Sequence, residues 1–476
     1  MIKKLLRSLA RLAPGHAHGH GKAGAHDPQV YKASRVGIDR ALVSSAANRT
    51  VEGLQKAGYR AFIVGGAVRD LMLGMRPKDF DVATDATPEQ VQRIFRRARI
   101  IGRRFKIVHV MFGSETIEVS TFRALSADNQ ETDAHGRVLN DNTFGEQHED
   151  ATRRDFTINA LYYDPLSDSV LDYHHGVEDL KARLIRMIGD PAQRYREDPV
   201  RMLRVVRFAA KLGFRIDGAT KAPIAQLAKL ITNVPDARLF DEMVKLLQSG
   251  QALKGLQGLR EHGLHHGCLP LVDAVLEPQG STEEKASALR FVELALASTD
   301  ARVRAGKPLS VGFLFATMLW HLVRYTWHAQ VAKGEKPIVA LQRAIDDVVD
   351  HQLSDLAIQK RIVADMREIW LLQPRFEKRV GASPFRLLDH LRYRAGYDFL
   401  LLRIEAEQAD AELGQWWTDF AAAEHEERLA LIKSVAKQPG QAATKKRRRR
   451  RGPRKDGAQE GEGHGGDGSG SDFEPQ

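Results

Sequence analysis

The chain has 476 residues, enough for roughly two to four domains with a substantial buried core. Cys268 is the only cysteine, which excludes a structural disulfide within the chain and favours a reducing compartment such as the cytoplasm. Lysine and arginine outnumber aspartate and glutamate by 72 to 61, and the resulting net charge of +11 suits a polyanionic partner.

The first 33 residues are rich in His, Gly and Ala and are expected to form a disordered extension. Their basic beginning is weakly amphipathic, which leaves peripheral contact with a membrane surface open. We assign no function to the histidines of this extension, His16, His18, His20 and His26, because no carboxylate or cysteine scaffold surrounds them.

No transmembrane segment is expected anywhere in the sequence. The most apolar stretch, Val311–Val323, is shorter than the roughly 20 residues of a membrane span and contains His321. This stretch therefore predicts a helix in the core of the protein.

Residues 34–175 mix short strands with short helices, which predicts a small mixed sheet and hence the β part of an α+β fold. The run AFIVGG ends a strand in a glycine turn, FDVAT is a short strand, and TPEQVQRIF begins a helix with Thr87 as N-cap and Pro88 at its first position. FKIVHVMF and TIEVSTF predict a hairpin around the turn GSE. A long polar loop follows, and ATRRDFTINALYY is then expected to be helical.

The rest of the chain shows mainly helical periodicity. We expect a helical neck over residues 176–265 and a helical body over 266–436. In the neck, DPVRMLRVVRFAAKLG predicts a helix with Asp198 as N-cap and Gly213 as its stop. Residues 437–476, an Arg-rich run followed by a Gly-rich acidic end, are expected to be disordered.

Two aspartates one residue apart, Asp79 and Asp81, are the first candidate for chemistry. In a strand they point to the same face, while Phe80 and Val82 point to the other. Two such carboxylates repel each other, and a divalent cation removes that repulsion. The pair predicts a Mg²⁺ site of the kind in which two metal ions assist phosphoryl or nucleotidyl transfer.

The diglycine Gly65–Gly66 supplies the second half of this candidate site. Glycines between a strand and a short helix let backbone amides approach a phosphate chain closely. Arg69 could add a charge-assisted bond to the phosphates, or it could pair with its neighbour Asp70, and the sequence favours neither alternative.

Three motifs in this order, VGGAVRDLMLGMRPKDFDVAT, RRDFTINALYY and RYREDPVRMLRVVRFAAKLGF, closely resemble the class II nucleotidyltransferases. This family comprises bacterial poly(A) polymerases and CCA-adding tRNA enzymes, and the resemblance runs from about Tyr59 to Phe214. It implies a nucleotidyltransferase palm of the polymerase-beta type in residues 34–175, followed by a neck and a body that bind nucleotide and RNA.

The resemblance also implies roles for single residues of this palm. Asp79 and Asp81 would bind the metal, Asp155 would be a further functional carboxylate, and Arg153 and Arg154 would lie near the incoming ribose or triphosphate. Glu118, on a neighbouring strand, competes with Asp155 for the place of third carboxylate at the metal, and the question stays open.

In REDPVR, the residues Glu197, Asp198 and Arg201 resemble the motif with which this family recognises the base edge of the nucleotide without a template. Arginine and carboxylate side chains offer donors and acceptors in one plane, as reading a base edge requires. Asp198 would also serve as an ordinary N-cap, and the two roles can coexist.

The stretch RIIGRRFKIVHVMFG distinguishes the members of the family. Its residues Gly102, Arg103, Arg104, Phe105 and His109 resemble a run that the poly(A) polymerases carry. The basic run of the tail would bind any RNA through its phosphates, without sequence preference. We expect RNA contacts from Arg103 and Arg104 and from this run, Lys445, Lys446, Arg447, Arg448, Arg449, Arg450 and Arg451.

The resemblance thus implies template-independent addition of AMP from ATP to RNA 3′ ends, with Mg²⁺ as cofactor, in a monomer that has possible protein partners in RNA decay. One alternative is a CCA-adding enzyme, which would use CTP and stop after three nucleotides on tRNA. Another is a non-catalytic RNA-binding protein on an inactive palm, against which the intact Asp79, Asp81 and Asp155 argue.

Overall fold

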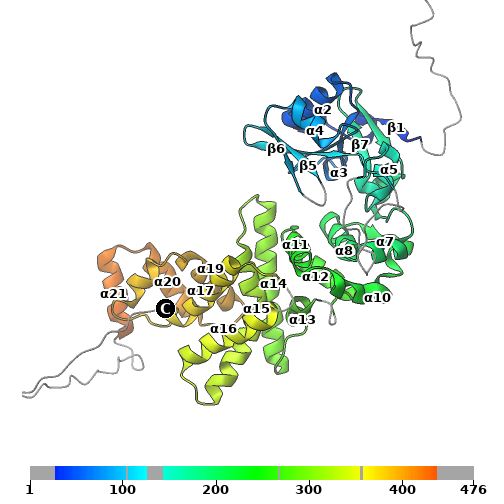
Figure 1. Ribbon diagram of the computed structural model, residues 1–476. Helices are drawn as coiled ribbons and strands as arrows, with labels where there is room; N and C mark the ends of the chain where they lie inside the picture. The colour runs from blue at the N-terminus through cyan, green and yellow to red at the C-terminus, as the bar shows by residue number, and fades with distance from the viewer. Residues whose placement is uncertain (1–26, 103–105, 126–142, 266–268, 354–356, 437–476) are drawn as a thin grey trace, which may run out of the picture.

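The computed structural model describes residues 27–102, 106–125, 143–265, 269–353 and 357–436. A mixed sheet with α2 and α4 packed on it forms one end of the molecule, and helices make up the rest (Figure 1). The expected α+β architecture, a small mixed sheet followed by helices, is confirmed.

One sheet of eight strands has the order β1-β8-β7-β2-β3-β6-β5-β4. All its neighbours are antiparallel except β3 and β6, and a parallel pair, β9 and β10, stands apart from it. The strands are β1 (Gln29–Lys32), β2 (Ala61–Val64), β3 (Asp81–Thr84), β4 (Ala98–Ile101), β5 (Ile107–Phe112), β6 (Glu115–Thr121), β7 (Leu161–Asp164), β8 (Ser169–Asp172), β9 (Leu184–Ile185) and β10 (Arg215–Ile216).

Short helices accompany the sheet, and longer ones follow it. The first group comprises η1 (Ala33–Val36), η2 (Arg40–Leu42), α2 (Ser45–Lys56), α3 (Gly66–Met72), α4 (Pro88–Ile94), α5 (Gln147–Arg153), η3 (Thr157–Asn159) and α6 (Gly176–Ala182). The second comprises α7 (Pro191–Glu197), α8 (Val200–Leu212), α9 (Gly218–Lys221), α10 (Ile224–Leu227), η4 (Ala228–Asn233), α11 (Asp236–Leu247), α12 (Ala252–Glu261), α13 (Pro270–Leu276), α14 (Thr282–Arg304), α15 (Val311–Ala332), α16 (Pro337–Leu353), α17 (Lys360–Phe376), α18 (Ser383–Leu388), α19 (Tyr393–Glu405), α20 (Ala411–Ala422) and α21 (His425–Ala436).

Local signals in the sequence set several of these boundaries. Helix α4 begins with a capping box in which Thr87 and Gln90 satisfy each other's backbone N–H groups, with Pro88 at the first helical position. Gly213 ends α8 in the left-handed conformation, at φ 65°. The hairpin of β5 and β6 also forms in the expected place.

The expected helix over ATRRDFTINALYY is wrong beyond Arg153. Helix α5 ends there, Arg154 is extended, and the chain continues through η3 into strand β7. Tyr162 and Tyr163 are adjacent and both fully buried, one in each of the two apolar clusters of the sheet. Side chains buried on both faces are typical of a central strand. At this position tertiary packing therefore outweighs the helical spacing of the apolar residues.

Two other expectations about the sheet need correction. The end of the segment 1–33, expected to be disordered, forms the edge strand β1, which pairs with β8. Strand β3 begins at Asp81, so Asp79 precedes the strand. The β2–β3 pairing ends at Val64 and Asp81, because the chain turns at Gly65, whose φ is 72°. Strand β2 therefore has no residue that pairs with Asp79.

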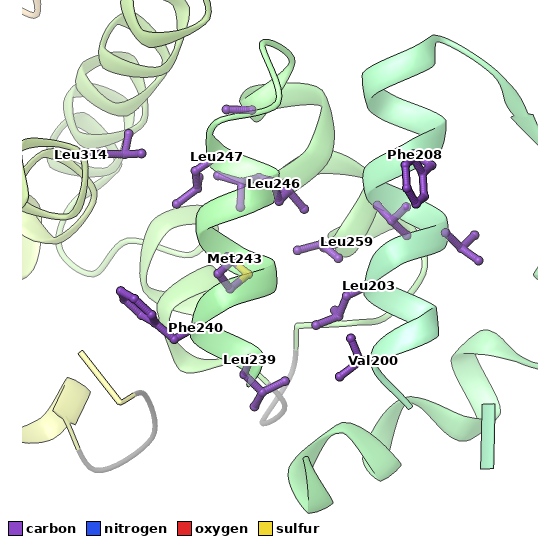
Figure 2. Packing of buried hydrophobic residues seen from close by; sticks show 14 of the residues in the cluster. Val200, Leu203, Phe208, Leu239, Phe240, Met243, Leu246, Leu247, Leu259 and Leu314 are labelled. Atoms are coloured by element: carbon purple, nitrogen blue, oxygen red, sulfur yellow. The ribbon is translucent and has the colours of Figure 1, made fainter. Parts of the chain in front are cut away.

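Apolar side chains join α8, α11, α12 and α15 into one core (Figure 2). Leu203 of α8 and Leu246 of α11 are buried, with Leu259 of α12 between the two helices. The apolar stretch 311–323 lies in α15 and is largely buried, as expected of a core helix. Among the described residues, no helix is long and apolar enough to cross a membrane.

Gly176, the first residue of α6, packs against the backbone of η3. A Cβ atom there would lie 2.3 Å from the carbonyl oxygen of Thr157, so the Gly176→Ala variant must push two backbone segments apart. We expect this variant to lose about 1–3 kcal/mol of stability, seen as a lower midpoint of thermal unfolding. Gly218→Ala is the matched control, because no atom lies within 4 Å of the added methyl group; equal midpoints for the two variants would contradict the packing argument.

Candidate active site

A cavity of about 560 Å³ opens where the end of the sheet meets α8 and α11. Its lining includes Gly65 and Asp81 from the sheet end, Arg201 from α8 and Arg238 from α11. In all, seven of the residues that line it are arginine or lysine and five are aspartate or glutamate. A concave site with this mixture of charges suits an anionic ligand that brings its own cations.

Asp81 lines this cavity, and two further carboxylates, Glu118 and Asp79, are its neighbours. Asp81 is the direct neighbour of Glu118 across the parallel β3–β6 pair, and Asp79 is close enough to act on the charge of Asp81. Asp81 is exposed to solvent on one side, while protein atoms surround its carboxyl group on the others. This partial burial, followed by Glu118 and Asp79, raises the pKa of Asp81 to about 6, while Arg154 opposes the shift.

Carboxylates that repel one another in this way fit a divalent cation. Among the described residues, no three His, Cys, Asp or Glu side chains are already gathered closely enough to hold a metal by themselves. Mg²⁺ usually takes only one or two protein carboxylates and completes its shell with substrate phosphates and water. Asp81 and Asp79, with Glu118 beside them, supply a donor set of that kind.

The diglycine turn forms the wall of the cavity next to these carboxylates. Gly65 has φ 72°, which favours glycine, and a Cβ atom on it would lie 3.2 Å from Nη1 of Arg154. Arg69 donates two hydrogen bonds to Oδ1 of Asp70, at 2.8 and 2.6 Å, and a third to Oδ1 of Asn159 at 2.7 Å. Arg69 therefore pairs with its neighbour Asp70, and it also lines the cavity.

Arg153 and Arg154, the C-terminal end of α5 and the residue after it, also line the cavity. Arg154 lies over the ring of Tyr162 and donates to Oδ2 of Asp150 at 3.2 Å. Burial and the surrounding arginines lower the pKa of Arg153 to about 10, so its surroundings are rich in positive charge. Arg194 of α7 fixes this turn by donating to the backbone carbonyls of Arg153 and Arg154 at 2.7 and 2.9 Å.

Asp155 joins the sheet to helix α8. Its Oδ2 accepts two hydrogen bonds from Arg204, at 2.9 and 2.6 Å, and its Oδ1 accepts from Asn159 and from the amide of Phe156. Burial alone raises the pKa of this carboxyl, but Arg204 and the hydrogen bonds outweigh it and lower the pKa to about 2. Both oxygens of Asp155 therefore already accept hydrogen bonds from the protein. Of the two candidates for the third carboxylate, Glu118 is the one paired with Asp81.

The residues of REDPVR take different positions. Arg201 and Asp198 line the cavity, whereas Glu197 accepts from Arg194 at 2.9 Å and from Arg201 at 3.1 Å outside the lining. The expected N-cap role of the Asp198 side chain is wrong. Its Oδ2 accepts from Arg238 of α11 at 3.0 Å, and its buried Oδ1 has no hydrogen-bond partner among the described residues.

Several lining residues were missed by the sequence analysis. Arg204 and Phe208 lie three and seven positions after Arg201 on one face of α8, so helical spacing could have found them. The α11 residues Arg238, Asp241, Glu242 and Lys245 form a charged stripe at the same helical spacing. The sequence offered no signal that this stripe faces the cavity, because only the tertiary packing of α11 against α8 brings it there.

Some predicted RNA-binding residues lie outside the described residues. These are Arg103 and Arg104, and the basic run Lys445, Lys446, Arg447, Arg448, Arg449, Arg450 and Arg451. The four histidines of the N-terminal extension also lie outside them.

Family models match three parts of the chain. A model described as the poly A polymerase head domain matches residues 61–186, and one described as the probable RNA- and SrmB-binding site of polymerase A matches 213–276. A third, described as the polymerase A arginine-rich C-terminus, matches residues 333–455.

Known proteins are similar over most of the chain. Poly(A) polymerase I of Haemophilus influenzae is 43% identical over 417 residues, which cover 86% of this chain and 91% of the relative. Poly(A) polymerase I of Escherichia coli O157:H7 is 43% identical over 432 residues, covering 88% and 91%. A CCA-adding enzyme of Bacillus licheniformis is 37% identical over only 212 residues, or 44% of this chain and 52% of that enzyme.

Solved structures share the fold. A tRNA-processing enzyme in its apo form I has a TM-score of 0.55 at 20% identity, with 82% of this chain and 95% of that chain covered. A tRNA nucleotidyltransferase, solved with a primer tRNA and an incoming ATP analogue, has a TM-score of 0.52 at 20% identity and covers 81% of this chain and 99% of its own.

The match to the poly A polymerase head domain covers strands β2 to β8 of the mixed sheet with the glycine turn and Asp81, and it identifies a nucleotidyltransferase. The similarity to the two polymerases over most of the chain then fixes the particular family. The chain belongs to the bacterial poly(A) polymerases.

The Asp155–Arg204 pair generates a prediction about stability and pH. The Arg204→Ala variant leaves Asp155 buried without its cation, and we expect a loss of about 2–3 kcal/mol at pH 7 in urea denaturation. The pKa of Asp155 is about 2 in the folded chain, against about 3.9 in an unfolded one. The carboxylate therefore stabilises the fold above about pH 4, and this contribution is lost as the pH falls toward 2.

Between pH 7 and pH 3 the wild type should therefore lose about 1 kcal/mol more stability than Arg204→Ala does. Arg290→Ala is the control, because Arg290 makes an exposed pair with Glu407, a kind of pair worth at most about 1 kcal/mol. An equal pH dependence in wild type and Arg204→Ala would contradict the assigned coupling.

Proposed function

We propose that this chain is a poly(A) polymerase that transfers AMP from ATP to the 3′ hydroxyl of RNA without a template. The observation that carries the proposal is that one cavity is lined both by Asp81 and the glycine turn of the sheet and by Asp198 and Arg201 of the helical part. A nucleoside triphosphate requires such a site, with a phosphate end beside the metal-binding carboxylates and a base end beside side chains that can read it.

At the phosphate end, Gly65 would let a phosphate chain approach the backbone closely. The guanidinium group of Arg154 lies beside Gly65, and that of Arg69 lies beside Gly66. Both arginines are already oriented by their partners, Asp70 and Asn159 for Arg69 and Asp150 for Arg154. Donors held in place in this way stabilise the charge that develops on a departing pyrophosphate without needing to reorganise.

At the metal end, Asp79 and Asp81 would hold Mg²⁺, with Glu118 as the third carboxylate. A bound divalent ion would lower the pKa of the attacking hydroxyl and neutralise charge on the phosphates. We place Asp155 outside the metal site, because Arg204, Asn159 and the Phe156 amide already occupy both of its oxygens.

At the base end, Asp198 offers an acceptor and Arg201 a donor. Arg201 is held by Glu197 and by the carbonyl of Arg194, while Arg238 holds one oxygen of Asp198. The other oxygen, Oδ1, is a buried acceptor with no donor among the described residues. Adenine presents an amino donor beside a ring-nitrogen acceptor, which Asp198 and Arg201 complement.

The lone Cys268 fits a reducing compartment, and we propose the cytoplasm as the site of action. Protein partners in RNA decay, the monomeric state and contact with a membrane surface stay predictions from the sequence.

The nucleotide that is incorporated tests the function directly. Each of the four labelled nucleoside triphosphates is supplied with Mg²⁺ to the full chain, on a generic RNA and on tRNA lacking its 3′ end. We expect long additions from ATP alone on both RNAs. Addition of CTP that stops after three nucleotides on tRNA would indicate a CCA-adding enzyme, and no addition from any nucleotide would indicate a non-catalytic RNA-binding protein.

Removal of a metal-binding carboxylate tests the mechanism. Asp79→Ala and Asp81→Ala should each abolish AMP incorporation, because the metal loses a ligand, while RNA binding measured by gel shift stays within about twofold of wild type. Asp164→Ala, at the far end of β7, is the control and should keep activity. Retained activity in Asp79→Ala would contradict the assignment.

The basic tail is expected to bind RNA through phosphates alone. Replacing Arg447, Arg448, Arg449, Arg450 and Arg451 with Gln should weaken binding of any RNA and flatten its salt dependence by up to about five units of slope. The KM for ATP should stay unchanged, because the cavity is formed elsewhere. An unchanged salt slope would show that the tail does not contact the RNA backbone.

A further inference from the structure

Among the residues that the structure describes, no helix packs on one half of a face of the sheet, and this half begins beside Asp81. Along β5 and β6, alternate residues (Val108, Val110, Ile117 and Val119) are buried in the core that α2 and α4 share with the sheet. The residues between them face the other way and are half-buried or exposed: His109, Met111, Thr116 and Glu118. On this second face, α5 covers only the other half, through a cluster of Phe62, Val64, Ala83, Phe122, Tyr162 and Ala151.

The register of the strands places four polar residues in line on this face. Arg99 of β4 is paired with His109 of β5, His109 with Glu118 of β6, and Glu118 with Asp81 of β3. Neighbouring strands lie about 4.8 Å apart, so the line is about 14 Å long. We call Arg99, His109 and Glu118 the open row.

Two features of the open row suit a nucleic acid. Nε2 of His109 lies 3.3 Å from Oε1 of Glu118, which holds that carboxylate next to Asp81. Arg99 is exposed and makes no ion pair among the described residues, so its charge is available to a phosphate. Ile101, two residues on and facing the same way, is 42% exposed and offers an apolar surface to a base.

The geometry of the reaction indicates which substrate binds at the open row. In phosphoryl transfer the attacking and leaving oxygens lie roughly in line on opposite sides of the phosphorus. The proposed triphosphate site is at Gly65 and Arg69, after strand β2, whereas the open row lies on β6, β5 and β4, beyond β3 on the other side of Asp81. The attacking hydroxyl must therefore reach Asp81 from the side of the open row.

We propose that the open row binds the 3′-terminal nucleotides of the RNA that is extended, an inference that rests on the proposed function. Glu118 lies at the hydroxyl, His109 is a positioning residue that orients Glu118, and Arg99 binds a phosphate upstream of the 3′ end. The cavity and the open row then flank Asp81 as the sites of the two substrates.

Steady-state kinetics with a short oligoadenylate primer test the role of Arg99. Arg99→Ala and Arg99→Glu should raise the KM for the primer and lower the salt dependence of that KM by about one unit of slope, with the KM for ATP unchanged. Arg93→Ala is the matched control, since Arg93 is exposed on α4, on the covered side of the sheet. A primer KM in both Arg99 variants equal to that of the control would overturn the proposal.

The role of His109 has its own readout. His109→Ala should lower kcat about tenfold at saturating primer, the effect of losing a hydrogen bond to a charged group, and His109→Gln should restore most of it. A purely structural role would lower the unfolding midpoint without this rescue. An unchanged kcat in His109→Ala would remove His109 from the proposal.

Cross-linking locates the RNA without relying on turnover. An oligoadenylate ending in 4-thiouridine is irradiated with the Asp79→Ala variant, and we expect the cross-linked peptides to come from residues 98–101 and 107–121. Cross-links confined to α8 or α11 would overturn the inference and leave the proposed function standing. A wild type that incorporates no nucleotide would instead overturn the proposed function.

Discussion

The ion pair between Asp155 and Arg204 holds the two halves of the site together. Asp155 follows the helix that leads into strand β7, and Arg204 is on α8. From this pair, hydrogen bonds and ion pairs continue through Asn159 to Arg69 and Asp70 on one side, and through Glu242 to Arg207 and Lys245 on the other. Helix α3, which follows the glycine turn, and helices α8 and α11 are thus parts of one network.

A site so rich in charge is costly to assemble, because taking charged groups out of water carries a desolvation penalty. The protein limits this cost by giving most cations a carboxylate partner, as with Arg204 and Asp155 or Arg238 and Asp198. The carboxylates at Asp81 are the exception, since the neighbouring charges of Glu118 and Asp79 help to raise the pKa of Asp81. That imbalance is local, and metal ions and a polyphosphate together would remove it.

Much of the fold, and the glycine turn of the candidate site, could be predicted from the sequence, because their signals are local. The turn at Gly65, the capping box of α4 and the stop at Gly213 follow from a few neighbouring residues. The errors have a common cause in tertiary structure: Tyr162 and Tyr163 are buried on two faces of a sheet, Asp198 is drawn away from its cap by Arg238, and Asp79 has no strand beside it. None of these partners is close in sequence, so no local pattern could have revealed them.

The central claim is that the Asp155–Arg204 pair assembles one ATP site from the sheet and the helices. Isothermal titration calorimetry of ATP with the full chain, in wild type and in Arg204→Ala, tests this most directly. With the thermal unfolding of the variant confirming a folded chain, we predict at least about tenfold weaker binding of ATP. An ATP dissociation constant equal to that of the wild type would contradict the claim.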